Sequence, residues 1–513
     1  MQTVLMLLSL VLAATLTARA DKVIAHYDAH QSKQLVPLLS EVLHFRTYAG
    51  NEEAHAAQKE WLRKTAKELG FVTRDAGKMT EIELPGPANA PILGLVIHGD
   101  VQPVDEEAWT FPPFEGRVEN GYVLGRGAAD DKGPLAQALM AMHAFAASGL
   151  KRTHTIRLLV GSEEESEAGE IAEYLKDHTP PDYSLVLDSE FPVVVGEKAW
   201  DGLAVDAPLT TRPGVTKSYH VASIDAGLAP SIVPERAEVK LVWNEGSAPD
   251  WTQLISDLQN AKLPVGTRIV TGPGADASEL RVVTYGKSAH AGVNLTGGRN
   301  ALVALARALE GKLPSGGADD LFAFVRMAGQ DLHGTGLGIT DDDPVWGRYA
   351  VNIATVKRKE DHDELFINLR RIPPRTAAEA RALLQEAVAA FDRRTGASLT
   401  FDEADSYFKD EPLGFDRTSP IVRRLMDIYT RATGEQARPA ISGGGTYAKR
   451  LPRSIAFGMW FPGKPYPGHD VDEKIPIADL HRGARVLIHA LVDIATGPPI
   501  ENAFGGRVVM KKE

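Results

Sequence analysis

The sequence contains no cysteine among its 513 residues. Disulfide bonds and thiolate zinc sites are therefore excluded, and a zinc site would have to use histidine and carboxylate ligands. The absence of cysteine suits an oxidising compartment, although it does not require one.

Basic residues are also fewer than acidic residues. There are 56 Lys and Arg residues against 68 Asp and Glu residues, which gives a formal net charge of -12. The basic residues are scattered, so we expect no basic face for nucleic acid and no nucleic-acid partner. With 43% hydrophobic and 24% charged residues, the composition is ordinary for a globular protein, and the length suggests two or more domains.

No segment after the first 20 residues is long and apolar enough to span a bilayer. Residues 1–20 hold an apolar stretch from Val4 to Leu16 that ends in Ala18-Arg19-Ala20, a pattern typical of a secretory signal peptide. An uncleaved membrane anchor is the alternative, since no Lys or Arg precedes the stretch, but its apolar core is short for a spanning helix. We expect secretion across the inner membrane, to the periplasm or the exterior, and no membrane association after signal removal.

Internal repeats are absent as well, and beyond residue 20 helical and strand patterns alternate. The segments "FVTRDAG" and "MTEIELP" read as edge strands, and "APILGLVIHGD" is a continuous apolar run typical of buried parallel strands. Further strand and helix patterns follow as far as "SLVLDSE". This alternation predicts an α/β layer with a mostly parallel sheet.

The pattern changes after about Lys198. Strand-like segments such as "ELRVVTYGKSAHAG" and "DELFINLRRIPP" belong to a different sheet, with helical segments between them. We therefore predict a two-domain α/β protein, in which residues 21–198 and 410–513 form the mostly parallel domain. An α+β domain of residues 199–409 is inserted between these two parts.

Polar residues cluster where the predicted strands end. His98 and Asp100 close "LGLVIHGD", and their i, i+2 spacing puts both on one face of a strand. A carboxylate so placed can hold the second nitrogen of a metal-binding histidine. A lone histidine at a strand end is more often structural, so this pair needs support from other positions.

Further carboxylates and a second histidine supply that support. "GRGAADDKG" has two adjacent aspartates before a helix, and a helix N-cap accounts for only one of them. "GSEEESEAGE" reads either as a solvated acidic helix start or as packed metal ligands. "VLDSEFP" and the His469 loop "FPGKPYPGHDVDE" complete the series. Because ligand sites form at the carboxyl ends of parallel strands, these segments together predict a two-metal site.

In this order, "HGDVQPV", "WTFPPFEG", "LGRGAADDKG" and "GSEEES" resemble the signature of a co-catalytic zinc metallopeptidase family. That family includes carnosinase, aminoacylase, acetylornithine deacetylase and carboxypeptidase G, and the resemblance covers nearly all of the chain after residue 20. "LDSEFPVVVGEKAW", "YGKSAHAG", "FINLRRIPP" and "GGGTYAKRLP" are more narrowly similar to peptidase V, the bacterial Xaa-His dipeptidase branch. The resemblance implies a catalytic domain of zinc-peptidase type, an inserted lid or dimerisation domain, and hydrolysis of dipeptides that have a free C-terminal carboxylate.

The resemblance also implies a role for each residue of the two-zinc site. His98 and Asp188 would bind one zinc, Glu165 and His469 the other, and Asp130 would bridge both. Asp100 would orient His98, and Glu164 would be the general base for the attacking water. Co2+ or Mn2+ also suits such histidine and carboxylate ligands.

The lid would supply the contacts to the substrate. By resemblance, His290 polarises the substrate carbonyl and Arg370 clamps the terminal carboxylate, although the adjacent Arg371 leaves that assignment open by one position. The glycines around Gly444 would line the other side of the substrate. Ser231 stands where the branch has an asparagine, so the dipeptide specificity can differ.

Two other functions fit the same motifs. An N-acyl amino acid deacylase would use the same metals, because the pocket and not the metal selects the acyl group. A non-catalytic peptide-binding relative is the third hypothesis, but none of the expected ligands has been lost. We expect a small peptide as the substrate and a monomer or a homodimer. The length of the lid resembles the branch in which one chain supplies the whole site.

Overall fold

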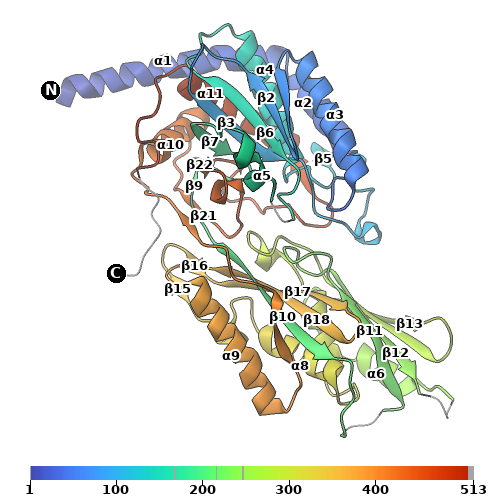
Figure 1. The fold of residues 1–513 in the computed structure, drawn as a ribbon. Helices are drawn as coiled ribbons and strands as arrows, with labels where there is room; N and C mark the ends of the chain where they lie inside the picture. The colour runs from blue at the N-terminus through green and yellow to red at the C-terminus, as the bar shows by residue number, and fades with distance from the viewer. Residues whose placement is uncertain (1, 167–168, 215–216, 245–247, 506–513) are drawn as a thin grey trace. The chain divides into compact units, whose positions relative to one another are not determined.

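The computed structural model describes residues 2–166, 169–214, 217–244 and 248–505, and Figure 1 shows the course of the chain. Its described residues form two compact units. The first contains residues 2–197, 413–468 and 472–505, and the second contains Lys198–Pro412 together with His469–Val471. The second unit is therefore inserted in the first, and the chain leaves the first unit again for the three residues that begin with His469.

A six-stranded sheet forms the centre of the first unit. Its strand order is β1 (Val72–Ala76), β2 (Met79–Leu84), β6 (Thr155–Gly161), β3 (Ile92–His98), β7 (Tyr183–Val186) and β22 (Ser454–Ala456). The last four strands run parallel, while β1 and β2 pair antiparallel. The predicted mostly parallel sheet is thereby confirmed.

One detail of the predicted sheet is wrong. The segment "MTEIELP" was expected at an edge, but β2 lies between β1 and β6 and all six of its residues are buried. Strand β1 forms the edge instead, with four of its five residues at least partly exposed.

Seven α-helices of the first unit are described: α1 (Gln2–Ala29), α2 (Ser32–Val42), α3 (Glu52–Glu68), α4 (Lys132–Ala147), α5 (Glu170–Asp177), α10 (Pro420–Thr433) and α11 (Ile477–Ala495). Helix α4 is buried along nearly its whole length and packs against α11, α2 and β3. The apolar residues of "PLAQALMAM" explain this position, because a helix that is apolar on all sides is covered on all sides.

Three small sheets complete the first unit. They are β20 (Leu413–Gly414), β9 (Val194–Glu197) and β21 (Ala440–Ser442); β24 (Lys474–Pro476), β5 (Tyr122–Leu124) and β4 (Arg117–Glu119); and β23 (Met459–Trp460) with β8 (Ser189–Glu190). Each of these sheets joins the two parts of the first unit that the second unit separates in sequence.

The second unit is an eight-stranded antiparallel sheet with helices packed on it. The strand order is β13 (Arg268–Pro273), β14 (Glu279–Tyr285), β12 (Arg236–Trp243), β11 (Tyr219–Ala226), β17 (Ala350–Arg358), β18 (His362–Arg371), β10 (Ala199–Pro208) and β19 (Thr400–Tyr407). The helices are α6 (Thr252–Gln259), α7 (Ala301–Ala308), α8 (Gly317–Ala328) and α9 (Ala377–Thr395), and β15 (Asp342–Asp343) pairs with β16 (Gly347–Arg348). This is the predicted α+β architecture.

The first helix continues through the predicted signal segment into the following residues. Val23 and Tyr27 of α1 are buried in the core of the first unit, where the Tyr27 hydroxyl hydrogen-bonds His481 Nδ1 at 2.8 Å. Within the residues that the structure describes, no helix combines the length and the apolar character needed to cross a membrane.

Candidate metal centre and active site

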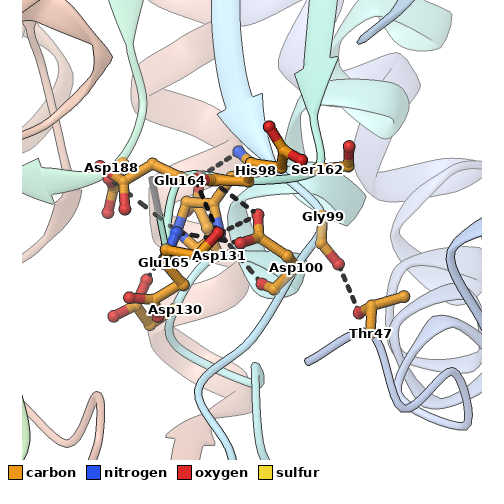
Figure 2. Close-up of polar contacts among 12 residues, drawn as sticks. Thr47, His98, Gly99, Asp100, Asp130, Asp131, Ser162, Glu164, Glu165 and Asp188 are labelled. Atoms are coloured by element: carbon orange, nitrogen blue, oxygen red, sulfur yellow. Dashed lines mark hydrogen bonds and ion pairs between the residues drawn. The ribbon is translucent and has the colours of Figure 1, made fainter. Parts of the chain in front are cut away.

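The candidate metal ligands of the first unit stand where neighbouring elements end. His98 is the last residue of β3, Glu164 and Glu165 follow β6, and Asp188 follows β7. Because β6, β3 and β7 are adjacent and parallel, their carboxyl ends meet at one edge of the sheet. Asp130 arrives at the same place from the loop before α4, as Figure 2 shows.

The first predicted ligand set is assembled in this unit. His98 Nε2 lies 2.9 Å from Asp130 Oδ1 and 3.9 Å from Asp188 Oδ2. One ligand atom from each of the three residues lies within 4.8 Å of the others. The His98 ring is fully buried, and its Nδ1 donates to the backbone carbonyl of Asp100 at 3.0 Å. This bond directs Nε2 towards the carboxylates, which is the orientation that a metal ligand needs.

The carboxylate of Asp100 contacts both His98 and the loop that carries the glutamates. Its two oxygens accept the backbone N–H groups of Glu164 at 3.2 Å and of Glu165 at 2.9 Å. The nearer carboxylate oxygen is 3.5 Å from His98 Nδ1, so the carbonyl makes the closer contact with the imidazole. Asp100 therefore connects the histidine to the glutamate loop, and its side chain positions that loop.

Burial and neighbouring charges shift the pKa values of the ionisable residues in this cluster. Burial, together with the charges of Glu165, Asp100 and Asp130, raises the pKa of Glu164 to about 8, against the effect of His98. Burial also raises the pKa of Asp188, as does the charge of Asp131. Burial lowers the pKa of His98, but its contacts with Asp100 and Asp130 outweigh burial and raise it.

The raised pKa values of these carboxyl groups indicate that their ionised forms need a positive charge close by. An imidazole nitrogen with several carboxylate oxygens is a donor set that zinc and similar divalent ions accept. Bound cations would favour the ionised carboxylates and offset their mutual repulsion. The residues present in the first unit therefore fit a metal centre.

Two residues of the second predicted ligand set, Asp130 and Glu165, lie in the first unit. Asp130 and Glu165 each place a carboxylate oxygen within 4.8 Å of the other, and Gln102 Nε2 donates to Glu165 Oε2 at 3.0 Å. His469 is counted with the second unit, so its metal contact stays a prediction. Chain connectivity keeps His469 within one peptide bond of Gly468, which belongs to the first unit.

Glu473 was missed by the sequence analysis, although it lies in the same motif, "GHDVDE". Its carboxylate is fully buried and accepts the backbone N–H groups of Ala129 at 2.8 Å and Asp130 at 3.2 Å. It also forms a 2.7 Å ion pair with buried Arg126. These bonds fix the loop that carries Asp130, and an acidic residue four positions after His469 was the only sequence signal.

Tyr466 was missed too. It lines a small pocket of the first unit together with Asp131 and Asp188. Burial raises the pKa of its hydroxyl well above the ordinary value, and the negative charges of Asp130 and Asp188 act in the same direction. The Tyr466 hydroxyl therefore stays protonated and is a hydrogen-bond donor beside the acidic cluster.

In the second unit, the structure brings three of the predicted substrate residues together. Arg370 donates to Ser231 Oγ at 3.2 Å, and Trp200 Nε1 donates to the same oxygen at 3.3 Å. The residue after Ser231, Ile232, forms a β-bridge with His290. Gly444 belongs to the first unit, in the loop after β21, where its N–H donates to Ser442 Oγ at 3.0 Å.

The protonation of His290 follows from its neighbours. Its Nδ1 accepts the backbone N–H groups of Gly292 and Val293, both at 2.9 Å. A neutral imidazole that accepts at Nδ1 carries its proton on Nε2. His290 also stacks on His469, with ring centroids 4.4 Å apart, so two predicted site histidines are neighbours within the second unit.

The two adjacent arginines have different environments. Arg371 is fully buried and forms a 2.8 Å ion pair with Asp201, and it contacts Glu411 at 3.1 Å. Arg370 donates hydrogen bonds to Asn368 at 3.0 Å and to Ser231 at 3.2 Å. Arg371 already neutralises a buried aspartate, and the binding of an external carboxylate by Arg370 stays a prediction.

Comparisons with known proteins identify the family of the chain. Residues 94–493 match the family model described as Peptidase family M20/M25/M40. The chain is 30% identical over 410 residues to the Bacillus subtilis protein named "Putative dipeptidase YtjP", and the match covers 79% of this chain and 83% of that one.

Solved structures show the same fold. Human carnosine dipeptidase 1 matches with a TM-score of 0.58 and 12% identity, over 93% of this chain and 99% of that chain. The di-peptidase Dug1p from Saccharomyces cerevisiae matches with a TM-score of 0.59 and 14% identity, over 94% and 99%. The family match extends over most of the sequence and includes the strands that carry His98, Glu165 and Asp188. The chain therefore belongs to peptidase family M20/M25/M40 and is a dipeptidase-type hydrolase.

Proposed function

We propose that this protein is a two-zinc dipeptidase that hydrolyses the amide bond of dipeptides with a free C-terminal carboxylate. The observation that supports this most is the buried cluster of His98, Asp130 and Asp188, with Glu164 beside it. A cluster that only stabilised the fold would not need so many carboxylates around one imidazole.

Five side chains would hold the metals. His98 and Asp188 would hold one ion, Glu165 and His469 the other, and Asp130 would be shared; Co2+ and Mn2+ suit these ligands as well as Zn2+. When bound, two neighbouring divalent cations supply Lewis acidity, which activates water and stabilises negative charge on the scissile carbonyl.

Glu164 is the proposed general base. Burial and the neighbouring carboxylates raise its pKa, which increases its affinity for a proton, and a positioned carboxylate can both accept and release one. It would take a proton from the attacking water and pass it to the leaving amine. The Asp100 carboxylate fixes the backbone of Glu164 for this role.

The second unit would bind the peptide itself. The Nε2–H of His290 is a neutral donor suited to the substrate carbonyl, where negative charge develops during attack. Arg370 offers a planar guanidinium, which matches a terminal carboxylate better than an ammonium group does. Ser231 contacts Arg370 and so helps to orient it.

Purified protein loaded with zinc would test this function against a panel of dipeptides and a panel of N-acyl amino acids. We expect release of amino acids from dipeptides, loss of this activity after chelation, and its return with zinc. Turnover of N-acyl amino acids alone would replace the dipeptidase with a deacylase. No zinc-dependent turnover in either panel would favour the non-catalytic peptide-binding relative.

We also propose that the protein is secreted and that its signal peptide is removed after Ala20. Cleavage there would keep Val23 and Tyr27, which pack in the core of the first unit. Mass spectrometry of the protein from its native cell would show a mature chain that begins at Asp21. A chain that still begins at Met1 would contradict the proposal.

A further inference from the structure

A second group of acidic residues surrounds a histidine on the sheet of the second unit. Asp206 of β10 lies directly opposite Glu364 of β18, and Ala204 of β10 lies opposite Asp402 of β19. Residues that are paired across strands, or two positions apart along one strand, share a face of a sheet. Asp206, His362, Glu364 and Asp402 therefore lie on one face, at three neighbouring strands.

The ligand atoms of this group are close enough for one ion. Asp206, His362 and Glu364 each place one such atom within 4.8 Å of the other two. His362 Nε2 is 3.4 Å from Asp206 Oδ1. Two ligands at about 2.1 Å from a tetrahedral zinc ion are themselves about 3.4 Å apart, so this pair has the separation of two ligands of one ion. Glu364, Asp402 and Asp405 form a second such group that shares Glu364.

Burial at this site leaves carboxylate oxygens in need of a partner. Glu364 is 9% exposed, and among the described residues no hydrogen-bond donor reaches its Oε2. The buried Oδ1 of Asp206 also accepts no hydrogen bond from the described residues, although His362 Nε2 lies 3.4 Å from it. Lys359 Nζ lies 3.4 Å from Glu364 Oε1 and 3.6 Å from Asp405 Oδ2, which offsets one of the negative charges. Desolvated carboxylate oxygens without a donor are costly, and a cation would remove that cost.

The imidazole of His362 is oriented as a ligand. Asp361 Oδ1 lies 2.7 Å from His362 Nδ1, so Nδ1 donates to it and Nε2 faces Asp206. A carboxylate behind the distal nitrogen is the usual support of a metal-binding histidine. Among the titratable neighbours, Asp361, Asp206 and Glu364 all favour the charged form of His362, so a proton on Nε2 is the competing explanation.

We propose that Asp206, His362 and Glu364 bind a divalent transition-metal ion such as Zn2+, separate from the catalytic metals. One imidazole combined with carboxylates suits zinc or manganese better than calcium or magnesium. Asp402 adjoins the site from β19, the last strand of the second unit. The ion would tie β10 to β18, and its role would be to stabilise the pairing of these two strands. The site is built from the second unit alone and does not depend on the proposed catalytic function.

The zinc content of the full-length protein tests this site. The parent, an Asp206→Asn/His362→Gln double variant and a His220→Gln control would be dialysed against the same low-micromolar zinc buffer. His220 lies on β11 of the same sheet and hydrogen-bonds Asn244, away from the acidic group. Mass spectrometry of the metal should show one zinc per chain fewer in the double variant, and no change in the control. Equal zinc in the parent and the double variant would overturn the proposal.

A His98→Ala variant separates this site from the catalytic metals. It should lose catalytic zinc and keep the equivalent that depends on His362. If the proposed catalytic metals do not exist, the difference between the parent and the Asp206→Asn/His362→Gln variant still remains, so the two proposals fail independently. Dipeptide hydrolysis by the double variant should stay within about twofold of the parent, because the affected residues are outside the catalytic machinery.

Crystals of the parent protein grown with zinc give a measurement that needs no variant to fold. We expect an anomalous-scattering peak at the zinc absorption edge, within bonding distance of His362 Nε2 and the carboxylates of Asp206 and Glu364. The absence of a peak there, in crystals whose catalytic site shows one, would overturn the proposal and favour a protonated His362.

Discussion

The carboxylate of Glu473 accepts the backbone N–H of Asp130 at 3.2 Å. The same carboxylate accepts the N–H groups of Gly127 at 3.1 Å and Ala129 at 2.8 Å, and it pairs with Arg126 at 2.7 Å. One buried carboxylate thus accepts hydrogen bonds from three backbone N–H groups of the same loop. Since Asp130 is the proposed shared ligand, Glu473 sets where that ligand stands without being a ligand itself.

Replacing Glu473 should therefore weaken both the fold and the metal site. A Glu473→Gln variant keeps the size of the side chain but removes the charge that offsets buried Arg126, which typically costs about 3–5 kcal/mol of unfolding free energy. Chemical denaturation would measure this loss, and calorimetric titration with zinc would show weaker binding. As a control, Glu386→Gln removes one partner of an exposed pair with Arg393 and should cost less than about 1 kcal/mol. Equal losses in the two variants would contradict the role of Glu473.

Glu164→Gln should lower kcat about 10²–10⁴-fold, because a general base contributes about that much. Zinc content should stay at the parent level, since Glu164 is not a proposed ligand. The neighbouring Glu163→Gln is the matched control: Glu163 is partly exposed and pairs with Lys78, so its kcat should change little. A Glu164→Gln variant as fast as the parent would refute the mechanism.

Arg370→Lys should raise KM for dipeptides about 10–100-fold, because hydrogen bonds to charged groups contribute about 1.5–3 kcal/mol. Dipeptides with an amidated C-terminus should show no such change, since they lack the carboxylate. The companion variant Arg371→Lys should instead lower the unfolding temperature, because Arg371 is fully buried against Asp201. If Arg371→Lys raised KM for dipeptides and Arg370→Lys did not, the carboxylate contact would belong to Arg371.

Acid should destabilise the first unit through His489. Burial lowers the pKa of His489 to about 4, helped by Arg431 and opposed by Asp21 and Asp493. The folded state thus keeps His489 neutral, while the unfolded state takes up a proton below about pH 6.5. The stabilisation is complete above pH 6.5 and is lost as the pH falls towards 4, with an upper limit of about 3 kcal/mol.

Thermal unfolding from pH 7 to pH 4 would measure this effect. A His489→Gln variant should show a shallower decline of Tm over that range than the parent. An identical decline in the two proteins would mean that other groups control the acid sensitivity.

Removal of metal should loosen the glutamate loop before other parts of the first unit. Without cations, repulsion among Glu164, Glu165 and Asp130 is opposed by the bonds that the loop N–H groups donate to Asp100 and by the bond from Gln102 to Glu165. Hydrogen exchange with and without a chelator should show faster exchange at residues 162–166, with little change in helix α11. Unchanged exchange in the loop would argue against metal ligands there.

Much of the fold could be predicted because its signals are local. The apolar run before His98 and the alternation of strands and helices predict parallel strands without knowledge of their partners. The position of "MTEIELP" inside the sheet could not be predicted, since a strand becomes internal only when another strand, here β1, pairs with its free side.

Part of the candidate site could likewise be predicted from local signals, and part of it could not. His98, Glu165 and Asp188 could be placed together because the ends of adjacent parallel strands meet. The bond from Glu473 to Asp130 joins residues 343 positions apart, and no periodicity or spacing in the sequence reports such a contact.

The sequence by itself determined the family, the order of the metal-binding motifs and the residue types available for catalysis. These properties follow from short segments, whose chemistry does not depend on distant contacts. The tertiary structure alone decided that the Asp100 carboxylate holds the glutamate loop, that Arg371 pairs with Asp201, and that Asp206 lies beside His362. Each of these depends on strand register and burial, which exist only after segments far apart in sequence have packed together.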